Sequence, residues 1–234
     1  MNWAKTHPRA KYELTASGVA PAGGTEFDGH CDPSDLQERG TYGDPDLIRA
    51  ISRFRGVDQE RVLPVPGTSC ANFIALAATA HTGDRVLIES PGYDPLLRVA
   101  RFLGLQVRRF DRRPDRDWRA DLEALRAGLR EGALAVVMTN LHNPSGRLCP
   151  ADDLAEIAAL TAEYGARLIV DEVYLDYAVL NAGRARSSAI GLGEQVLVTD
   201  SLTKVYGLGG LRAGWLIAEP QVLRRAREIV DLLH

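Results

Sequence analysis

Short apolar runs alternate with helical patterns along most of this chain, and that alternation limits the folds open to it. The runs are rich in β-branched residues and uninterrupted, which is typical of strands covered on both faces. Strands that alternate with helices predict a mainly parallel sheet with right-handed crossovers. We therefore expect an α/β fold of three layers, with helices flanking a mainly parallel, seven-stranded sheet. The expected strands are residues 61–65, 85–90, 105–110, 134–140, 166–173, 195–201 and 213–218.

Three helices are expected between these strands, at residues 69–83, 121–132 and 150–165. The third has the clearest boundary signals, with Pro150 at its start, acidic residues in its first turn and Gly165 at its end. The last expected strands lie close together along the chain, so one of them is a candidate for an antiparallel strand. The chain ends on a segment that begins as an amphipathic helix.

Composition gives no support to several classes of function. The 234 residues carry a formal net charge of −3, which argues against a nucleic-acid partner or a polybasic membrane surface. No apolar run approaches the length that spans a bilayer, and we expect no signal peptide, because the N-terminal residues lack its apolar segment. Cys31, Cys70 and Cys149 lack the spacing of a disulfide framework or a metal site. We therefore expect a reducing compartment, the cytoplasm.

Polar and ionisable residues follow three of the expected strands abruptly. Asn143 lies in "NLHNPSG", Asp171 begins "DEVYLDY", and Lys204 lies in "DSLTKVYG". Because the carboxyl ends of parallel strands meet at one edge of a sheet, we expect these side chains to converge. Taken singly, each residue also fits an ordinary loop or helix-capping role. Together, the amide of Asn143, the carboxylate of Asp171, the phenol of Tyr174 in "DEVYLDY" and the amine of Lys204 predict a ligand site.

This set of residues fits the chemistry of an aldehyde cofactor that contains a pyridine ring. A lysine at a strand end can form an imine with the aldehyde, and a buried carboxylate keeps the ring nitrogen protonated. A phosphate on the same cofactor needs backbone N–H groups, hydroxyl groups and an arginine. The stretch "PGTSCANF" offers a glycine turn at a helix start. The candidate phosphate ligands are Thr68, Ser69, Ser201 and Arg212.

Six motifs give the chain a resemblance to a known family. The segment "SLTKVYGLGGLRAGW" resembles the cofactor-lysine segment of the class I/II aminotransferases, which are pyridoxal-phosphate enzymes of fold type I. The other motifs stand in the family's order and at similar spacing, from about Tyr42 to the end of the chain. They are "TYGDPDLIRAI", "PGTSCANFIAL", "ESPGYDPLL", "NLHNPSG" and "DEVYLDY".

The resemblance implies a role for each residue around the cofactor ring. Lys204 would hold pyridoxal 5'-phosphate as a Schiff base and then move a proton between the substrate and the cofactor. Asp171 would pair with the ring nitrogen. Asn143 and Tyr174 would hydrogen-bond the ring oxygen, and Tyr93 would stack on the ring face. The implied catalytic residues are Lys204, Asp171 and Tyr174.

The resemblance also implies how the phosphate is held. Its ligands would be the candidates named above, Thr68, Ser69, Ser201 and Arg212. Tyr42 resembles the tyrosine that reaches the phosphate of the neighbouring subunit, which implies a homodimer with shared sites.

A dense run of glycines follows the lysine. It would let the backbone fold back so that Lys204 and Arg212 both face the cofactor. The glycines are Gly207, Gly209, Gly210 and Gly214. A dinucleotide-binding interpretation of "GLGGLRAG" is weak, because Arg212 stands where that fingerprint has its third glycine or alanine.

The resemblance divides the chain into an N-terminal arm or small-domain segment at 1–40, a pyridoxal-phosphate-binding large domain at 41–219, and the start of an interdomain helix at 220–234. The C-terminal small domain, which brings the arginine for the substrate carboxylate, is expected to be absent from this chain. The implied activity moves an amino group between an amino acid and a 2-oxo acid. The alternatives are a related fold type I enzyme, such as a C–S lyase or a cyclising synthase, and a non-catalytic cofactor-binding module.

Overall fold

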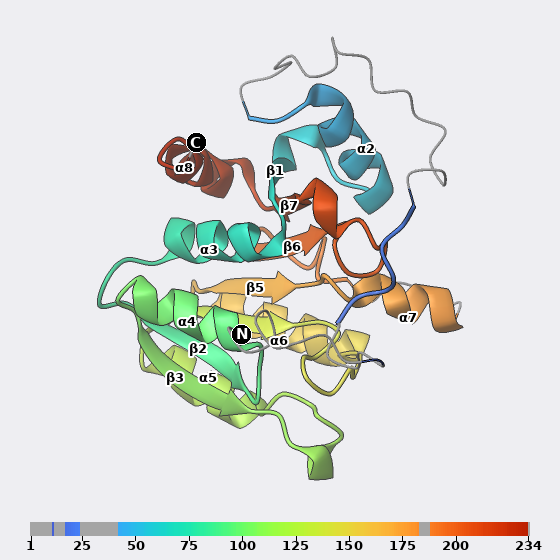
Figure 1. Cartoon of the computed structure of the whole chain (residues 1–234). Helices are drawn as coiled ribbons and strands as arrows, with labels where there is room; N and C mark the ends of the chain where they lie inside the picture. Colours follow the sequence, from blue (N-terminus) through green and yellow to red (C-terminus); the bar gives the residue numbers. More distant parts are fainter. Residues whose placement is uncertain (1–10, 12–16, 24–41, 183–187, 234) are drawn as a thin grey trace.

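The sheet at the centre of the molecule has the strand order β1-β7-β6-β5-β4-β2-β3 (Figure 1). The structure is a computed structural model, and it describes residues 11, 17–23, 42–182 and 188–233. The strands are β1 (Val62–Pro66), β2 (Arg85–Ser90), β3 (Gln106–Asp111), β4 (Ala133–Thr139), β5 (Arg167–Asp171), β6 (Val196–Ser201) and β7 (Ala213–Ile217). All of them lie within a few residues of the predicted ranges. Cys31 and most of the expected arm 1–40 lie outside the described residues.

Strands β3, β2, β4, β5 and β6 run parallel to their neighbours, and β7 runs antiparallel to both β6 and β1. The expected antiparallel strand is therefore confirmed as β7. The segment between β6 and β7 is too short for the crossover that a parallel neighbour requires. The register places Thr139, Asp171 and Thr199 side by side on β4, β5 and β6. Three polar side chains thus stand at the same level near the carboxyl ends of central strands.

Helices cover both faces of this sheet. One face packs against α3, α4 and α8, and the other packs against α5 and α6, which confirms the three expected layers (Figure 1). The helices are α2 (Pro45–Arg55), α3 (Thr68–Thr79), α4 (Asp94–Phe102), α5 (Leu122–Arg130), α6 (Ala151–Glu163), α7 (Leu175–Ala182) and α8 (Pro220–Val230). Short 3₁₀ turns lie at Gln59–Arg61, Pro114–Arg116 and Gly209–Leu211.

The sequence prediction left out α2, α4 and α7. Helix α2 carries a clear start signal, because the Asp44 carboxylate accepts hydrogen bonds from the backbone N–H groups of Asp46 and Leu47, at 2.8 and 3.1 Å. Both α2 and α4 have a proline in the first turn, which is typical of helix starts. The prediction that every strand is covered on both faces is wrong for β3. That edge strand exposes Gln106, so its pattern alternates.

Among the described residues, no helix combines the length and the apolar character needed to cross a membrane.

Candidate active site

A cavity of about 320 Å³ opens where β4, β5 and β6 end and α3 begins. It brings together every predicted site residue except Ser201 and Tyr42. Lys204 and Asp171, which follow and end neighbouring strands, line the same cavity. Its lining is Thr68, Ser69, Tyr93, Thr139, Asn143, Asp171, Val173, Tyr174, Thr203, Lys204, Gly209 and Arg212.

The Asp171 carboxylate is buried and held from two sides. Its Oδ2 accepts a hydrogen bond from Asn72 Nδ2 at 2.7 Å, and its Oδ1 accepts one from the backbone N–H of Val173 at 3.1 Å. The Asn72 amide is itself oriented, because its Oδ1 accepts the hydroxyl of Thr199 at 2.6 Å. Burial raises the pKa of Asp171 to about 6, against the hydrogen bonds and the charge of Lys204, which favour the ionised form. A cation placed beside this carboxylate would be strongly favoured.

Asn72 was not among the predicted site residues, although the sequence contains a signal for it. Asn72 lies one helical turn after Thr68 on α3, so both side chains stand on the same helix face. Because Thr68 lines the cavity, that spacing aims Asn72 at the same edge of the sheet. Thr139 and Thr203 were also missed, and each lies beside a residue that the motifs did identify.

Lys204 points its amine at Ser17 of the N-terminal segment, with 2.7 Å between Lys204 Nζ and Ser17 Oγ. Burial lowers the pKa of Lys204, the guanidinium of Arg212 lowers it further, and Asp171 opposes both effects. The backbone carbonyl of Lys204 accepts the hydroxyl of Tyr177 at 3.0 Å. The amine is therefore half-buried, fixed in place and easier to deprotonate than an ordinary lysine.

The first turn of α3 is built to receive an anion. Gly67 caps the helix with a φ of 86°, and the helix begins at Thr68 with its free N–H groups at the cavity. An added Cβ on Gly67 would lie 2.6 Å from Arg212 Nη2, so the glycine allows the guanidinium to approach the turn. Arg212 Nη2 also donates to the carbonyl of Pro66 at 3.2 Å, and Arg212 itself has a left-handed φ of 53°.

Ser201 lies behind the cavity wall. Its side chain is fully buried, and its hydroxyl accepts the hydroxyl of Thr68 and contacts that of Thr203, both at 2.7 Å. Thr203 lines the cavity, and the hydroxyl of Ser201 holds the side chain of Thr203 in place. A direct contact between Ser201 and a phosphate stays a prediction.

Three predicted ring-contacting residues, Tyr93, Asn143 and Tyr174, line the cavity. The loop of Asn143 is fixed because its backbone N–H donates to Thr139 Oγ1 at 2.8 Å. Burial raises the pKa of both tyrosines, which keeps their hydroxyl groups protonated at neutral pH. The ring of Tyr174 stacks on that of Tyr177, with 6.1 Å between centroids.

Tyr42 lies away from the cavity of its own chain. Its hydroxyl donates to Asp231 Oδ2 at 3.0 Å, and the guanidinium of Arg227 lies 5.5 Å from its ring centroid. The contact of Tyr42 with a second subunit stays a prediction.

Two of the glycines after Lys204 have a steric reason. Gly207 has a φ of 67°, and an added Cβ would lie 2.4 Å from the carbonyl oxygen of Ala20. A Cβ on Gly214 would lie 2.6 Å from Gly67 Cα. Gly209 and Gly210 have no such close contact among the described residues, and the role of the four glycines in folding the backbone back stays a prediction.

The donor set of this cavity fits pyridoxal phosphate. The cavity offers an amine for an aldehyde, a buried carboxylate for a pyridinium nitrogen, and a helix N-terminus with a guanidinium for a phosphate. No group of three or more His, Cys, Asp or Glu side chains in the described part of the chain is arranged to hold a metal ion.

Comparisons with known proteins identify chains that are similar to this one. The sequence profile of the family described as "Aminotransferase class I and II" matches residues 30–233. A probable aminotransferase of Arabidopsis thaliana is 29% identical over 207 residues, with 82% of this chain and 50% of the relative covered. A histidinol-phosphate aminotransferase of Erythrobacter litoralis is 31% identical, with 78% and 50% covered. A pyridoxal-phosphate-dependent aminotransferase of Streptococcus suis superposes with a TM-score of 0.76 at 29% identity, covering 82% of this chain and 50% of that structure. The chain thus spans about half the length of these relatives.

Proposed function

The chain belongs to the class I and II aminotransferase family, and from this premise we propose that it supplies the cofactor site of an enzyme that moves an amino group between an amino acid and a 2-oxo acid. One observation carries the proposal: the half-buried amine of Lys204 and the buried carboxylate of Asp171 line one cavity beside an anion-binding helix start. The relatives named above are aminotransferases, which favours transfer over a lyase or synthase reaction.

The proposed cofactor is pyridoxal phosphate, which when bound supplies an aldehyde that reacts with amines and a protonated ring that withdraws electrons. Asp171 would hold the proton on the ring nitrogen, because a cation beside its carboxylate offsets the burial that raises its pKa. The amine of Lys204, whose pKa burial lowers, would bond to the aldehyde and would then move the proton at the substrate's α-carbon.

The other lining residues would bind and orient the cofactor. The amide of Asn143 and the phenol of Tyr174 would donate to the ring oxygen, and the ring of Tyr93 would cover one ring face. The N–H groups of α3 at Thr68 and Ser69 would hold the phosphate together with Arg212.

We extend the proposal to the organisation of the protein. Residues 41–219 would form the cofactor-binding domain. Two copies would form a homodimer in which Tyr42 reaches the phosphate of the partner, and the protein would act in the cytoplasm on small-molecule substrates. The support for these points is the family match.

A visible-range absorption spectrum of the purified chain with added pyridoxal phosphate tests the proposal. We expect an absorption band of the imine, distinct from the absorption of the free cofactor, in the unsubstituted chain, and no such band in Lys204→Ala. Lys11→Ala, which removes an exposed lysine, is the matched control and keeps the band. A band that survives Lys204→Ala would overturn the assignment. With candidate amino acids, formation of a 2-oxo acid supports transfer, whereas release of ammonia with a broken side chain indicates a lyase.

A further inference from the structure

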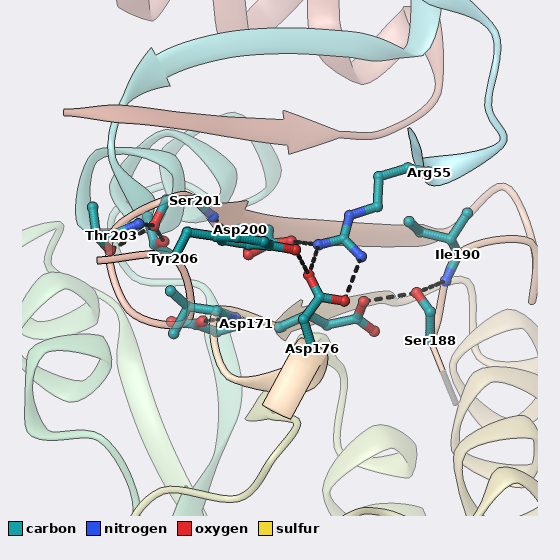
Figure 2. A network of polar contacts seen from close by, with 12 residues as sticks. Arg55, Asp171, Asp176, Ser188, Ile190, Asp200, Ser201, Thr203 and Tyr206 are labelled. Carbon is teal, nitrogen blue, oxygen red and sulfur yellow. Dashed lines mark hydrogen bonds and ion pairs between the residues drawn. The ribbon is translucent and has the colours of Figure 1, made fainter. Parts of the chain in front are cut away.

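Figure 2 shows an ionic cluster around Arg55, whose residues do not line the cavity. We call it the Arg55 cluster: Arg55, Glu172, Asp176, Asp200 and Tyr206. Arg55 ends α2, and its side chain is 2% exposed. Its Nη1 and Nη2 donate to Asp176 Oδ1 and Oδ2 at 3.2 and 2.8 Å, and its Nη2 also donates to Asp200 Oδ2.

The two carboxylates bound by Arg55 hold the lysine loop on both sides. Asp200 lies on the N-terminal side of Lys204, at the end of β6, and its Oδ1 accepts the backbone N–H of Ser201 at 2.6 Å. Asp176 holds the C-terminal side, because its Oδ2 accepts the hydroxyl of Tyr206 at 2.5 Å. A single guanidinium therefore links the strand before the lysine to the turn after it (Figure 2).

Contacts from this cluster reach the cavity. Asp200 fixes the backbone of Ser201, and the Ser201 hydroxyl contacts Thr203, which lines the cavity. Asp176 lies on α7, and Tyr177 of the same helix donates its hydroxyl to the carbonyl of Lys204. Movement of Asp200 or Asp176 would therefore shift Thr203 or the backbone of Lys204.

The position of Arg55 depends on features that a lysine does not have. Its guanidinium lies 4.6 Å from the ring centroid of Phe54 and 5.8 Å from that of Trp215. Phe54 also packs edge-on against Tyr206, with 6.5 Å between centroids. A planar group with several fixed donors can bind two carboxylates and pack on rings at once, whereas an ammonium is a compact point charge.

The cluster contains more acid than base. Glu172 accepts hydrogen bonds from Ser188 Oγ and the backbone N–H of Ala189, both at 2.7 Å, and it adds a third carboxylate near Arg55. Burial raises the pKa of Glu172 to about 7 and that of Asp200 well above its usual range, while Arg55 opposes both shifts. Arg55 is thus the one cation in the cluster, and it holds Asp176 and Asp200 by direct hydrogen bonds.

We propose that Arg55 is a positioning residue for Lys204, which fixes the lysine loop through Asp200 on one side and through Asp176 and Tyr206 on the other. The proposal rests on the proposed function, since it assigns Arg55 to the cofactor lysine. Arg55 is not among the residues that line the cavity, so it would act through the backbone on both sides of the amine.

Amide hydrogen exchange of the intact chain without cofactor tests the positioning directly. In Arg55→Met and Tyr206→Phe we expect about tenfold faster exchange at Leu202, Thr203 and Leu208, with unchanged exchange in β4 and β5. Arg55→Lys should fall between these variants and the unsubstituted chain. Arg49→Met is the matched control, because Arg49 lies on the same helix but its side chain is 47% exposed. If Arg55→Met does not fold, Tyr206→Phe decides, because it leaves the Arg55 ion pairs intact.

A second measurement links the loop to the amine. In this experiment pyridoxal phosphate is added and the imine formed on Lys204 is trapped with borohydride at timed intervals. Because only the neutral amine attacks the aldehyde, the pH midpoint of the rate of imine formation reports the pKa of the amine. In Tyr206→Phe we expect trapping at neutral pH to slow about tenfold, with the midpoint moving up toward that of an ordinary lysine. A merely structural role would leave this midpoint in place.

The outcomes separate this proposal from the proposed function. Unchanged exchange in Arg55→Met, or an unchanged midpoint together with unchanged exchange at Leu208 in Tyr206→Phe, overturns the proposal that Arg55 fixes both sides of the loop, even when the unsubstituted chain binds the cofactor through Lys204. Failure of the unsubstituted chain to be trapped at Lys204 overturns the proposed function instead, and the exchange result still decides whether Arg55 holds the loop.

Discussion

Two buried ionic clusters stand beside the candidate site, and they differ in charge balance. The Arg55 cluster places one arginine among three carboxylates. The second cluster is a single pair, in which Arg112 Nη1 donates to Glu89 Oε2 at 3.0 Å, and both side chains are almost fully buried. Glu89 Oε1 also accepts the backbone N–H and the hydroxyl of Thr139, at 2.8 and 2.6 Å.

The difference follows what each cluster holds. The Glu89–Arg112 pair connects the ends of β2 and β4 with the segment after β3, so it fixes strands of the sheet. The Arg55 cluster instead holds a loop that must present a reactive amine. A pair with equal positive and negative charge holds strands of the sheet together. In the acid-rich cluster, by contrast, the position of the loop depends on a single cation.

The largest effect is expected from breaking the balanced pair. Arg112→Met leaves the carboxylate of Glu89 buried without its counter-charge, and such losses cost about 3–5 kcal/mol. Urea unfolding near pH 8 measures the loss. A loss below about 1 kcal/mol would mean that the hydrogen bonds from Thr139 and protonation of Glu89 together replace the ion pair.

The pH dependence of two arginine variants sharpens the comparison. Removing either arginine raises the pKa of the carboxylates it leaves behind, so the folded variant takes up protons as the pH falls and regains stability. Each such proton changes the free energy of unfolding by about 1.4 kcal/mol per pH unit. We expect a steeper recovery between about pH 8 and pH 6 for Arg55→Met, which leaves several carboxylates, than for Arg112→Met, which leaves Glu89. Equal slopes would refute the difference in charge balance.

Asp171 is a buried carboxylate without an arginine, and its removal should stabilise the cofactor-free chain. Its pKa is raised from 3.8 to about 6, which corresponds to a cost of about 3 kcal/mol above pH 6 that vanishes as the pH falls toward 4. The amide of Asp171→Asn can accept only one of the two hydrogen bonds that the carboxylate receives, so the net gain is on the order of 1 kcal/mol. Thermal unfolding at about pH 7.5 measures it. The same variant should bind pyridoxal phosphate more weakly, and equal affinity would argue against the ring-nitrogen role.

The smallest effect is expected at an exposed ion pair. Arg49 pairs with Asp46 on α2, and their side chains are 47% and 58% exposed. Arg49→Met should change the free energy of unfolding by less than about 0.5 kcal/mol at any pH. A larger or pH-dependent change would mean that this exposed ion pair contributes to the free energy of unfolding as the buried pairs do.

Much of the fold could be predicted from local signals. Uninterrupted apolar runs mark buried strands, and the boundary residues of α6 mark a helix of ordinary length. Helices α4 and α7 are short, and α7 begins directly after the motif "DEVY", so no separate periodicity announces it. The edge strand β3 alternates because neighbours cover it less completely than the central strands.

The candidate site could be predicted only where its residues lie in local motifs. Thr68, Asp171 and Lys204 each stand at a strand or helix boundary that the sequence makes visible. The contact between Arg55 and Asp176 joins residues 121 positions apart, and that between Lys204 and Ser17 joins residues 187 apart. Contacts of this kind follow from tertiary packing, and no spacing in the chain announces them.

The lysine content of the chain allows a direct test of the central claim that Lys204 receives the cofactor. The lysines of this sequence are Lys5, Lys11 and Lys204. The measurement is borohydride trapping of the intact chain with substoichiometric pyridoxal phosphate, followed by peptide mass spectrometry. The account predicts label on Lys204, with little on Lys5 and Lys11. Label spread evenly over the three lysines, or confined to the N-terminal two, would contradict it.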